Sequence, residues 1–394
     1  MKWLRWLCVV VFALLVIQDV ARAAEGKRPY QVFNRLRVEY DDNVYQAETD
    51  KEDSIKIIEE LEFHVNLDLE NTFVSLRYRP SFVWWDNREE DDFDFQNEGD
   101  LVVNHEFSPR LTLSVVDTLR VGQQPELYER GILVRANEDF IYNAANATLG
   151  YLLRPTTRLD AAGRYIVLRY DTDELAATDD YDLYVAGLTL RHQVVQETAL
   201  LLDCRAEQVE YDLDTKGSQS LYGGAGIEQI FTKELVGTVR GGYQEKEFDD
   251  DAIDAESSPY ADAVLTYLVS PATRITAGAA FSMYESDLSP FASQDRSQVF
   301  ASVAWDVTAR VSLYLSGAYT ESDYSADAAV TPDLPDGTEE LVQVSSRATY
   351  KVNLSNWIEA GWQYQDFATD YEDSVLARVP YERNRLDVGW KTQF

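Results

Sequence analysis

The sequence predicts an all-β fold, a transmembrane up-and-down antiparallel β-barrel of about 18 strands. Three observations support this prediction. Apolar and polar residues alternate with a period of two in long segments, short connections alternate strictly with longer ones, and the last segment ends on an aromatic residue. A β-sandwich with Greek-key crossings would not keep such a strict alternation of connections.

The predicted strands follow one another along the chain. Their spans are 30–40, 57–69, 73–86, 98–107, 111–122, 140–151, 158–171, 181–192, 197–210, 219–231, 234–247, 259–269, 273–285, 297–308, 310–321, 341–352, 356–368 and 381–394. Eight tight turns, such as 70–72 and 108–110, alternate with nine longer loops. This is the rhythm of short periplasmic turns and long extracellular loops in an outer-membrane barrel.

The two faces of each strand differ in polarity. In the third segment Val74, Leu76 and Tyr78 share one face, and Ser75 and Arg77 lie on the other. This pattern could describe any antiparallel sheet with one solvated side. Strand length favours a membrane, because about nine to eleven tilted residues cross a bilayer and strands of soluble proteins usually have about five or six.

The start of the chain predicts secretion. Residues 1–23 combine the basic Lys2 and Arg5 with an apolar run from Leu7 to Ile17 and small residues at the end, as a signal peptide does. We expect residues 24–394 to form a single barrel domain. No later stretch approaches about eighteen consecutive apolar residues, so a spanning chain must close as a barrel.

Composition restricts the partners. The 394 residues carry a formal net charge of -34, with 45% hydrophobic and 12% aromatic residues. A disordered acidic chain would lack those aromatics, and the negative charge argues against a nucleic-acid partner.

The last strand resembles the terminal strand by which Gram-negative outer-membrane barrels are recognised for assembly. Leu386, Val388, Trp390 and Phe394 share one face of it. We therefore expect Trp390 and Phe394 to form an assembly signal, with the barrel-assembly machinery as a partner and the Gram-negative outer membrane as the location.

Three further segments carry a family resemblance. Residues 37–45, residues 116–120 followed by 124–127, and residues 383–394 are similar to parts of the outer-membrane proteins grouped as putative β-barrel porin 2. The resemblance implies an outer-membrane β-barrel, with some relatives associated with exopolysaccharide export, and it implies no catalytic residues. Thr392 departs from the family pattern, which usually has an apolar residue there.

Charged residues on the polar faces are candidates for lining a pore. They are Arg35, Arg37, Glu39, Glu60, Glu62, Arg77, Arg79, Arg164, Glu207, Arg240, Arg347, Glu359 and Lys391. Rings of opposed charge at a constriction filter solutes in wide pores. The alternative is that these side chains form ion pairs that fill the lumen.

Acidic runs fall in the predicted long loops. The candidates are Glu89, Glu90, Asp91, Asp92, Asp249, Asp250 and Asp251. One interpretation is an electronegative vestibule that concentrates cations or holds a divalent cation between carboxylates. The other is a solvated surface that keeps the loops soluble.

Two residues break the alternation in the predicted strands. Asp117 would face lipid, where a carboxylate is costly; a bulge or a position above the membrane rim would resolve this. His105 poses a milder form of the same problem. Cys204 is expected to be a small lipid-facing residue.

The sequence offers little for catalysis. It has three His residues, a single Cys after the leader, and no P-loop, dinucleotide fingerprint or zinc spacing. We expect neither an enzyme nor a resident cofactor.

The leading functional hypothesis is a porin-like aqueous channel for small hydrophilic solutes, with a preference for cations. One alternative is an exit pore for exopolysaccharide that works with periplasmic polysaccharide-export proteins. Another is a closed barrel whose loops act as a surface-binding or structural module. Each of them would be surrounded by outer-membrane lipid and lipopolysaccharide.

Overall fold

The structure is a computed structural model that describes residues 29–87, 92–122, 128–129, 132–133, 139–213, 216–250, 252–286, 291–325, 336–370 and 379–394. The predicted signal peptide lies outside these residues. In the described part of the chain no helix is long and apolar enough to cross a membrane.

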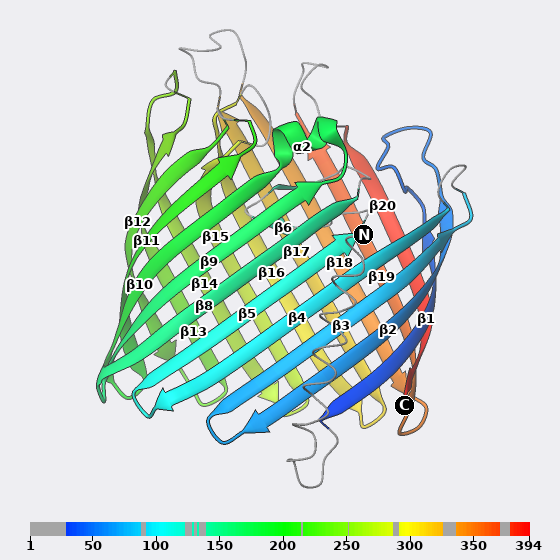
Figure 1. Ribbon diagram of the computed structural model, residues 1–394, viewed down its shortest axis with the longest axis horizontal. Helices are drawn as coiled ribbons and strands as arrows, with labels where there is room; N and C mark the ends of the chain where they lie inside the picture. Colours follow the sequence, from blue (N-terminus) through cyan, green and yellow to red (C-terminus); the bar gives the residue numbers. More distant parts are fainter. Residues whose placement is uncertain are drawn as a thin grey trace, which may run out of the picture.

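Eighteen long antiparallel strands form one closed barrel (Figure 1), which confirms the predicted fold class. They are β1 (Tyr30–Asp41), β2 (Ser54–Leu69), β3 (Thr72–Trp85), β4 (Phe93–Ser108), β5 (Leu111–Gly122), β8 (Phe140–Arg154), β9 (Thr157–Tyr170), β10 (Tyr181–Val195), β11 (Thr198–Tyr211), β12 (Ser218–Ile230), β13 (Leu235–Phe248), β14 (Glu256–Ser270), β15 (Thr273–Glu285), β16 (Ser293–Thr308), β17 (Val311–Ser325), β18 (Gly337–Lys351), β19 (Asn356–Thr369) and β20 (Tyr381–Gln393). Each long strand pairs with the next long strand along the chain. The barrel closes where β1 pairs with β20, from Phe33 opposite Gln393 to Asp41 opposite Arg385.

The connections differ between the two ends of the barrel. Glu70 and Asn71 alone join β2 to β3, whereas residues 42–53 join β1 to β2. Figure 1 shows the short turns at the lower end and the longer connections at the upper end. We call these the turn end and the loop end.

The loop end contains more regular structure than the sequence predicts. Strand β4 begins at Phe93 rather than at residue 98, because Phe93 and Phe95 continue the register against Trp84 and Phe82 of β3. A short hairpin, β6 (Tyr128–Glu129) with β7 (Ile132–Leu133), and the helix α2 (Asp173–Asp179) lie in segments predicted as loop.

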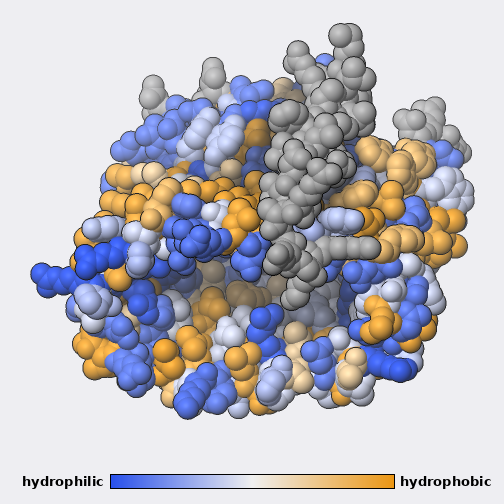
Figure 2. All heavy atoms as spheres, turned by 60° about the horizontal axis from the view of Figure 1, so that its bottom comes forward, coloured by the Kyte–Doolittle hydropathy of each residue, from blue (hydrophilic) through white to orange (hydrophobic). Residues whose placement is uncertain are grey.

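The outer and inner faces alternate along each strand. In β1, Leu36 and Val38 are 47% and 49% exposed. Arg37, which lies between them, is half-buried, and Glu39, which follows Val38, is buried. Figure 2 shows apolar side chains gathered over the outer wall and a hollow at the centre of the turn end. The exposed apolar surface is the one that a bilayer would cover.

Asp117 faces outward from the middle of β5. Its register is continuous between Leu101 of β4 and Ala145 of β8, so β5 has no bulge at this position. The side-chain amide of Asn143 on β8 instead donates hydrogen bonds to both carboxylate oxygens of Asp117, each at 3.2 Å. A paired carboxylate is less costly on an apolar face than a bare one.

The other two outward residues fit their expectations. His105 lies near the turn end of β4, where its ring nitrogen Nδ1 is 2.7 Å from the hydroxyl of Thr72. Cys204 is exposed on the outer face of β11, between Leu188 and Gly223.

Candidate functional site

One side of the barrel interior is covered by charged side chains, which we call the charged wall. It is built on β1–β5 and β18–β20, whose alternate residues face inward. Its basic members are Arg35, Arg37, Lys56, Arg77, Arg79, Arg120, Arg347, Arg383, Arg385 and Lys391, and its acidic members are Glu39, Asp41, Glu60, Glu62, Glu98, Asp100, Glu359 and Asp387.

At the centre of the charged wall, one carboxylate pairs with several guanidinium groups. Glu60 accepts from Arg35 at 3.2 Å and from Arg37 at 3.4 Å, and it lies 3.8 Å from Arg79. Arg35 also pairs with Glu359 of β19 at 2.9 Å. Such a network holds its members in fixed positions, because every side chain is restrained from more than one side.

A cavity of about 400 Å³ lies against this network. Side chains of β1–β4 and β18–β20 surround it, among them Arg37, Arg79, Glu98, Arg347 and Arg385. Its lining is mostly charged or amide-bearing, so the space suits water and hydrophilic solutes rather than apolar ones.

The charged wall ends toward the loops in a fully buried ion cluster. Arg383 of β20 donates to both carboxylate oxygens of Asp41 on β1, at 2.9 and 2.6 Å. Lys56 of β2 donates to Asp41 at 2.8 Å and to Glu39 at 3.1 Å, and its ammonium lies 4.2 Å from the ring centroid of Trp85. This cluster ties the first strand to the last.

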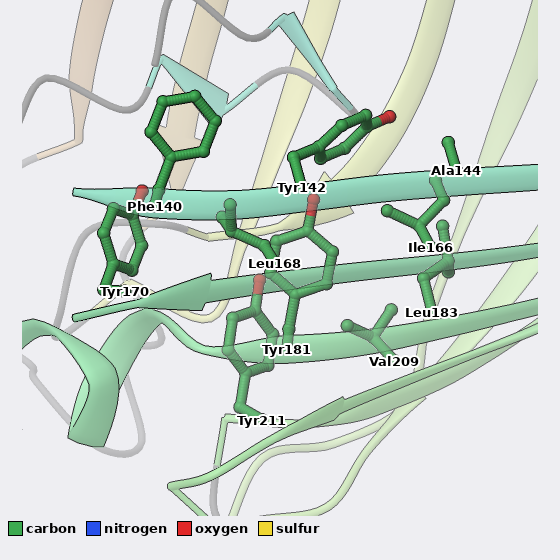
Figure 3. Close-up of a cluster of buried hydrophobic side chains, with 10 residues drawn as sticks. All are labelled: Phe140, Tyr142, Ala144, Ile166, Leu168, Tyr170, Tyr181, Leu183, Val209 and Tyr211. Carbon is green, nitrogen blue, oxygen red and sulfur yellow. The ribbon is translucent and has the colours of Figure 1, made fainter. Parts of the chain in front are cut away.

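The opposite inner wall is apolar near the loop end. The buried cluster on β8–β11 in Figure 3 consists of Phe140, Tyr142, Ala144, Ile166, Leu168, Tyr170, Tyr181, Leu183, Val209 and Tyr211. Leu175 and Ala176 of α2 pack against it, so α2 covers part of the inner face at the mouth. This cluster was not predicted from the sequence, although the run Ile166-Val167-Leu168 was a signal because both faces of β9 are apolar there.

The carboxyl group of Asp180 fixes the end of α2 to the barrel. Asp180 is 5% exposed, and it accepts a hydrogen bond from the backbone N–H of Tyr170 at 2.7 Å. Burial raises the pKa of this carboxyl, and the neighbouring Asp212 and Asp179 add to the effect.

The predicted pore-lining residues all lie on inner faces, but only some of them meet. The charged wall brings together Arg35, Arg37, Glu39, Glu60, Glu62, Arg77, Arg79, Arg347, Glu359 and Lys391. Arg164, Glu207 and Arg240 lie on β9, β11 and β13, outside this network. Arg240 pairs instead with Asp262 of β14 at 3.1 Å.

Several members of the charged wall were missed from the sequence. Asp41 and Lys56 lie just beyond the predicted ends of their strands, where the period of two continues and was a usable signal. Arg383 and Asp387 lie in the last predicted strand, and only barrel closure gives them their partners on β1, Asp41 and Arg37.

The acidic loop candidates are only partly described. Asp92 directly precedes β4, and Asp249 and Asp250 directly follow β13, all at the loop end. Glu89, Glu90, Asp91 and Asp251 lie outside the described residues. Across the described ranges, no group of three or more His, Cys, Asp or Glu side chains could hold a metal ion.

At the turn end, the last strand presents its aromatic residues outward. Trp390 is 44% exposed, and its indole N–H donates to Thr392 at 2.9 Å and to Asn356 of β19 at 3.2 Å. The backbone N–H of Phe394 donates to the carbonyl of Val32 on β1 at 2.9 Å. The hydroxyl of Thr392, unusual at its position, thus supports the Trp390 ring.

The chain matches the family described as putative β-barrel porin 2 over residues 34–394. Among solved structures it is similar to Pseudomonas aeruginosa OccK1 (OpdK), with 13% identity, a TM-score of 0.51, and coverage of 93% of this chain and 99% of that one. It is also similar to P. aeruginosa OpdK with vanillate (12% identity, TM-score 0.50, coverage 93% and 99%) and to Acinetobacter baumannii OccAB3 (13%, 0.47, 93% and 99%). At this identity the likeness concerns the fold alone. No curated protein matches the chain.

Proposed function

Because the chain belongs to the putative β-barrel porin 2 family, we propose that this porin-like outer-membrane barrel is an aqueous channel for small hydrophilic solutes. The family and the fold are those of channels rather than enzymes. The observation that carries the proposal is the polar cavity against the charged wall, in the interior of a closed barrel.

The charged wall favours the passage of solutes over their retention. Arg35 is already engaged by Glu60 and Glu359, and Arg77, Arg120 and Arg347 also pair with carboxylates. A solute that enters exchanges water for weak contacts with paired charges, so no single group binds it tightly. Conduction requires binding that is favourable enough for entry and weak enough for exit.

The channel prefers cations in this proposal. Because carboxylates within the charged wall offset its arginines, the wall contributes only a small net positive potential. The whole chain, in contrast, carries a net charge of -34. Asp92, Asp249 and Asp250 add negative charge at the loop end. Potentials of this kind raise the local cation concentration and are screened over about 10 Å at 0.1 M salt.

Reconstituted protein in planar bilayers tests both parts of the proposal. Single-channel current should be seen, and the reversal potential in a salt gradient should indicate cation preference that weakens as salt rises. Changing Glu89, Glu90, Asp91 and Asp92 together to amides should weaken the preference. The matched control changes acids of the short turns, Glu70, Glu197 and Glu234, to Gln.

Three outcomes would contradict the proposal. Absence of any conductance would favour a barrel whose lumen is blocked. Anion preference at low salt would mean that the lumenal arginines dominate the field. An equal effect of the loop and turn substitutions would remove the link between the acidic loops and selectivity.

A further inference from the structure

A groove of about 660 Å³ runs across the outer face of the barrel, over β5 and β8–β13. We call it the outer groove. Its floor is a row of small residues in register on neighbouring strands, Ala147, Gly163, Ala186 and Ala206. Each of them has the outward parity of its strand, so the groove opens toward the membrane and not into the lumen.

Packing within the chain does not require the groove to be empty. A Cβ atom added at Gly163 would meet only the carbonyl oxygen of Val185, at an ordinary 3.9 Å. A larger residue would therefore fit the fold here and fill the hollow. The space is open to another molecule.

One wall of the groove is rigid and aromatic. The rings of Tyr165 and Tyr184 stack with centroids 5.1 Å apart. The hydroxyl of Tyr165 donates to Asp182 at 2.6 Å, and Arg169 pairs with the same carboxylate. The rings are thus held in place beside the floor, which lowers the entropic cost of receiving an apolar chain.

The groove slopes through the membrane. Its β5 end is at Val115, near the middle of that strand, and its β13 end is at Glu245 and Glu247, close to the loop end. Seven strands at a spacing of about 4.8 Å give a length of roughly 29 Å. With strands tilted by about 35–45°, that length covers roughly 17–20 Å of depth, close to one leaflet of a bilayer that is about 40–45 Å thick overall.

The chemistry along the groove changes with depth. The side chains at the deep end, such as Val115, Ala145 and Ala147, are apolar. Gln208 and Gln219 follow along the groove, and the shallow end carries the exposed carboxylates Glu245 and Glu247. An amphiphile with an acyl chain below and a cation-binding head above matches this order. Phosphate oxygens and one or two carboxylates are a usual ligand set for Mg²⁺.

We propose that the outer groove holds an acyl chain of lipopolysaccharide from the outer leaflet, with a divalent cation bridging its phosphates to Glu245 and Glu247. A second barrel is a poorer occupant, because a convex wall would rest on the groove edges without reaching the floor at Gly163. The proposal is independent of whether the lumen conducts.

Native mass spectrometry of the refolded full barrel with rough-type lipopolysaccharide tests the proposal. In Mg²⁺ the wild type should retain one lipopolysaccharide molecule, and EDTA should release it. Gly163→Leu should lower the occupancy at least tenfold by filling the groove. Glu245→Gln with Glu247→Gln should abolish the difference between Mg²⁺ and EDTA.

The matched control is Gly223→Leu, an outward glycine on β12 whose added Cβ meets nothing within 4 Å and which does not line the groove. Heat-modifiability on gels verifies that each variant is folded. Equal occupancy in Gly163→Leu and the wild type, or an equal loss in Gly223→Leu, would overturn the proposal. So would a change of oligomeric state in Gly163→Leu by light scattering, because it would assign the groove to a second copy.

Discussion

The buried cluster that joins β1 to β20 gives a sharp stability prediction. Arg383 is 2% exposed and Asp41 is 0% exposed, and Arg383→Met would leave Lys56, whose ammonium lies 2.8 Å away, to compensate the charge of the Asp41 carboxylate. Removing one member of a buried ion pair costs about 3–5 kcal/mol. Because Lys56 still compensates Asp41, we expect a loss of about 3 kcal/mol in the free energy of unfolding.

Guanidinium unfolding of the refolded barrel in detergent micelles, followed by tryptophan fluorescence, measures this loss. The double variant Arg383→Met with Asp41→Asn should lose less free energy of unfolding than the sum of the losses in the two single variants, because the pair acts as a unit. The matched control is Arg158→Met, which removes a pair with Asp160 whose side chains are 44% and 23% exposed. We expect the control to lose less than about 1 kcal/mol. Equal small losses in Arg383→Met and Arg158→Met would refute the reasoning.

Deletion of Phe394 should reduce the amount of heat-modifiable barrel in the outer membrane while secretion across the inner membrane continues; normal amounts would count against an assembly role of the last strand. Protease added to intact cells should cut within 87–95 or 322–338, and cleavage confined to the short turns would reverse the proposed orientation. Because burial raises the pKa of Asp180 above its usual 3.8, the docking of α2 should be firmest while this acid is protonated and should weaken as pH rises through the raised value. Hydrogen exchange of α2 amides, corrected for intrinsic rates, should show this trend, and the trend should be absent in Asp180→Asn.

Strand number and order could be predicted from the sequence because the period of two is a local property. Val74, Leu76 and Tyr78 keep one face whatever their neighbours are. Helix α2 could not be predicted in this way, since it has seven residues and no side-chain hydrogen bond at its N-cap. Packing of Leu175 and Ala176 on the barrel stabilises it.

The inner-face position of the charged residues was also predictable, but their partners were not. Arg35 and Glu359 are 324 positions apart, and they meet because β1 closes the barrel against β20 beside β19. Asp117 shows the same limit on the outer face. Alternation gave its direction correctly, but the amide of Asn143 that pairs with it lies on another strand, beyond the reach of a local pattern.

Substituted-cysteine accessibility tests most directly whether the charged wall lines a water-filled pathway. In a Cys204→Ser background, Arg79→Cys places a thiol beside the polar cavity, and Leu36→Cys places one on the outer face, where Leu36 is 47% exposed. A charged, membrane-impermeant methanethiosulfonate reagent should change the single-channel current of the Arg79→Cys variant and leave that of the Leu36→Cys variant unaltered. Current that is insensitive to modification at position 79, in protein shown by mass to be modified, would contradict a conducting path along the charged wall.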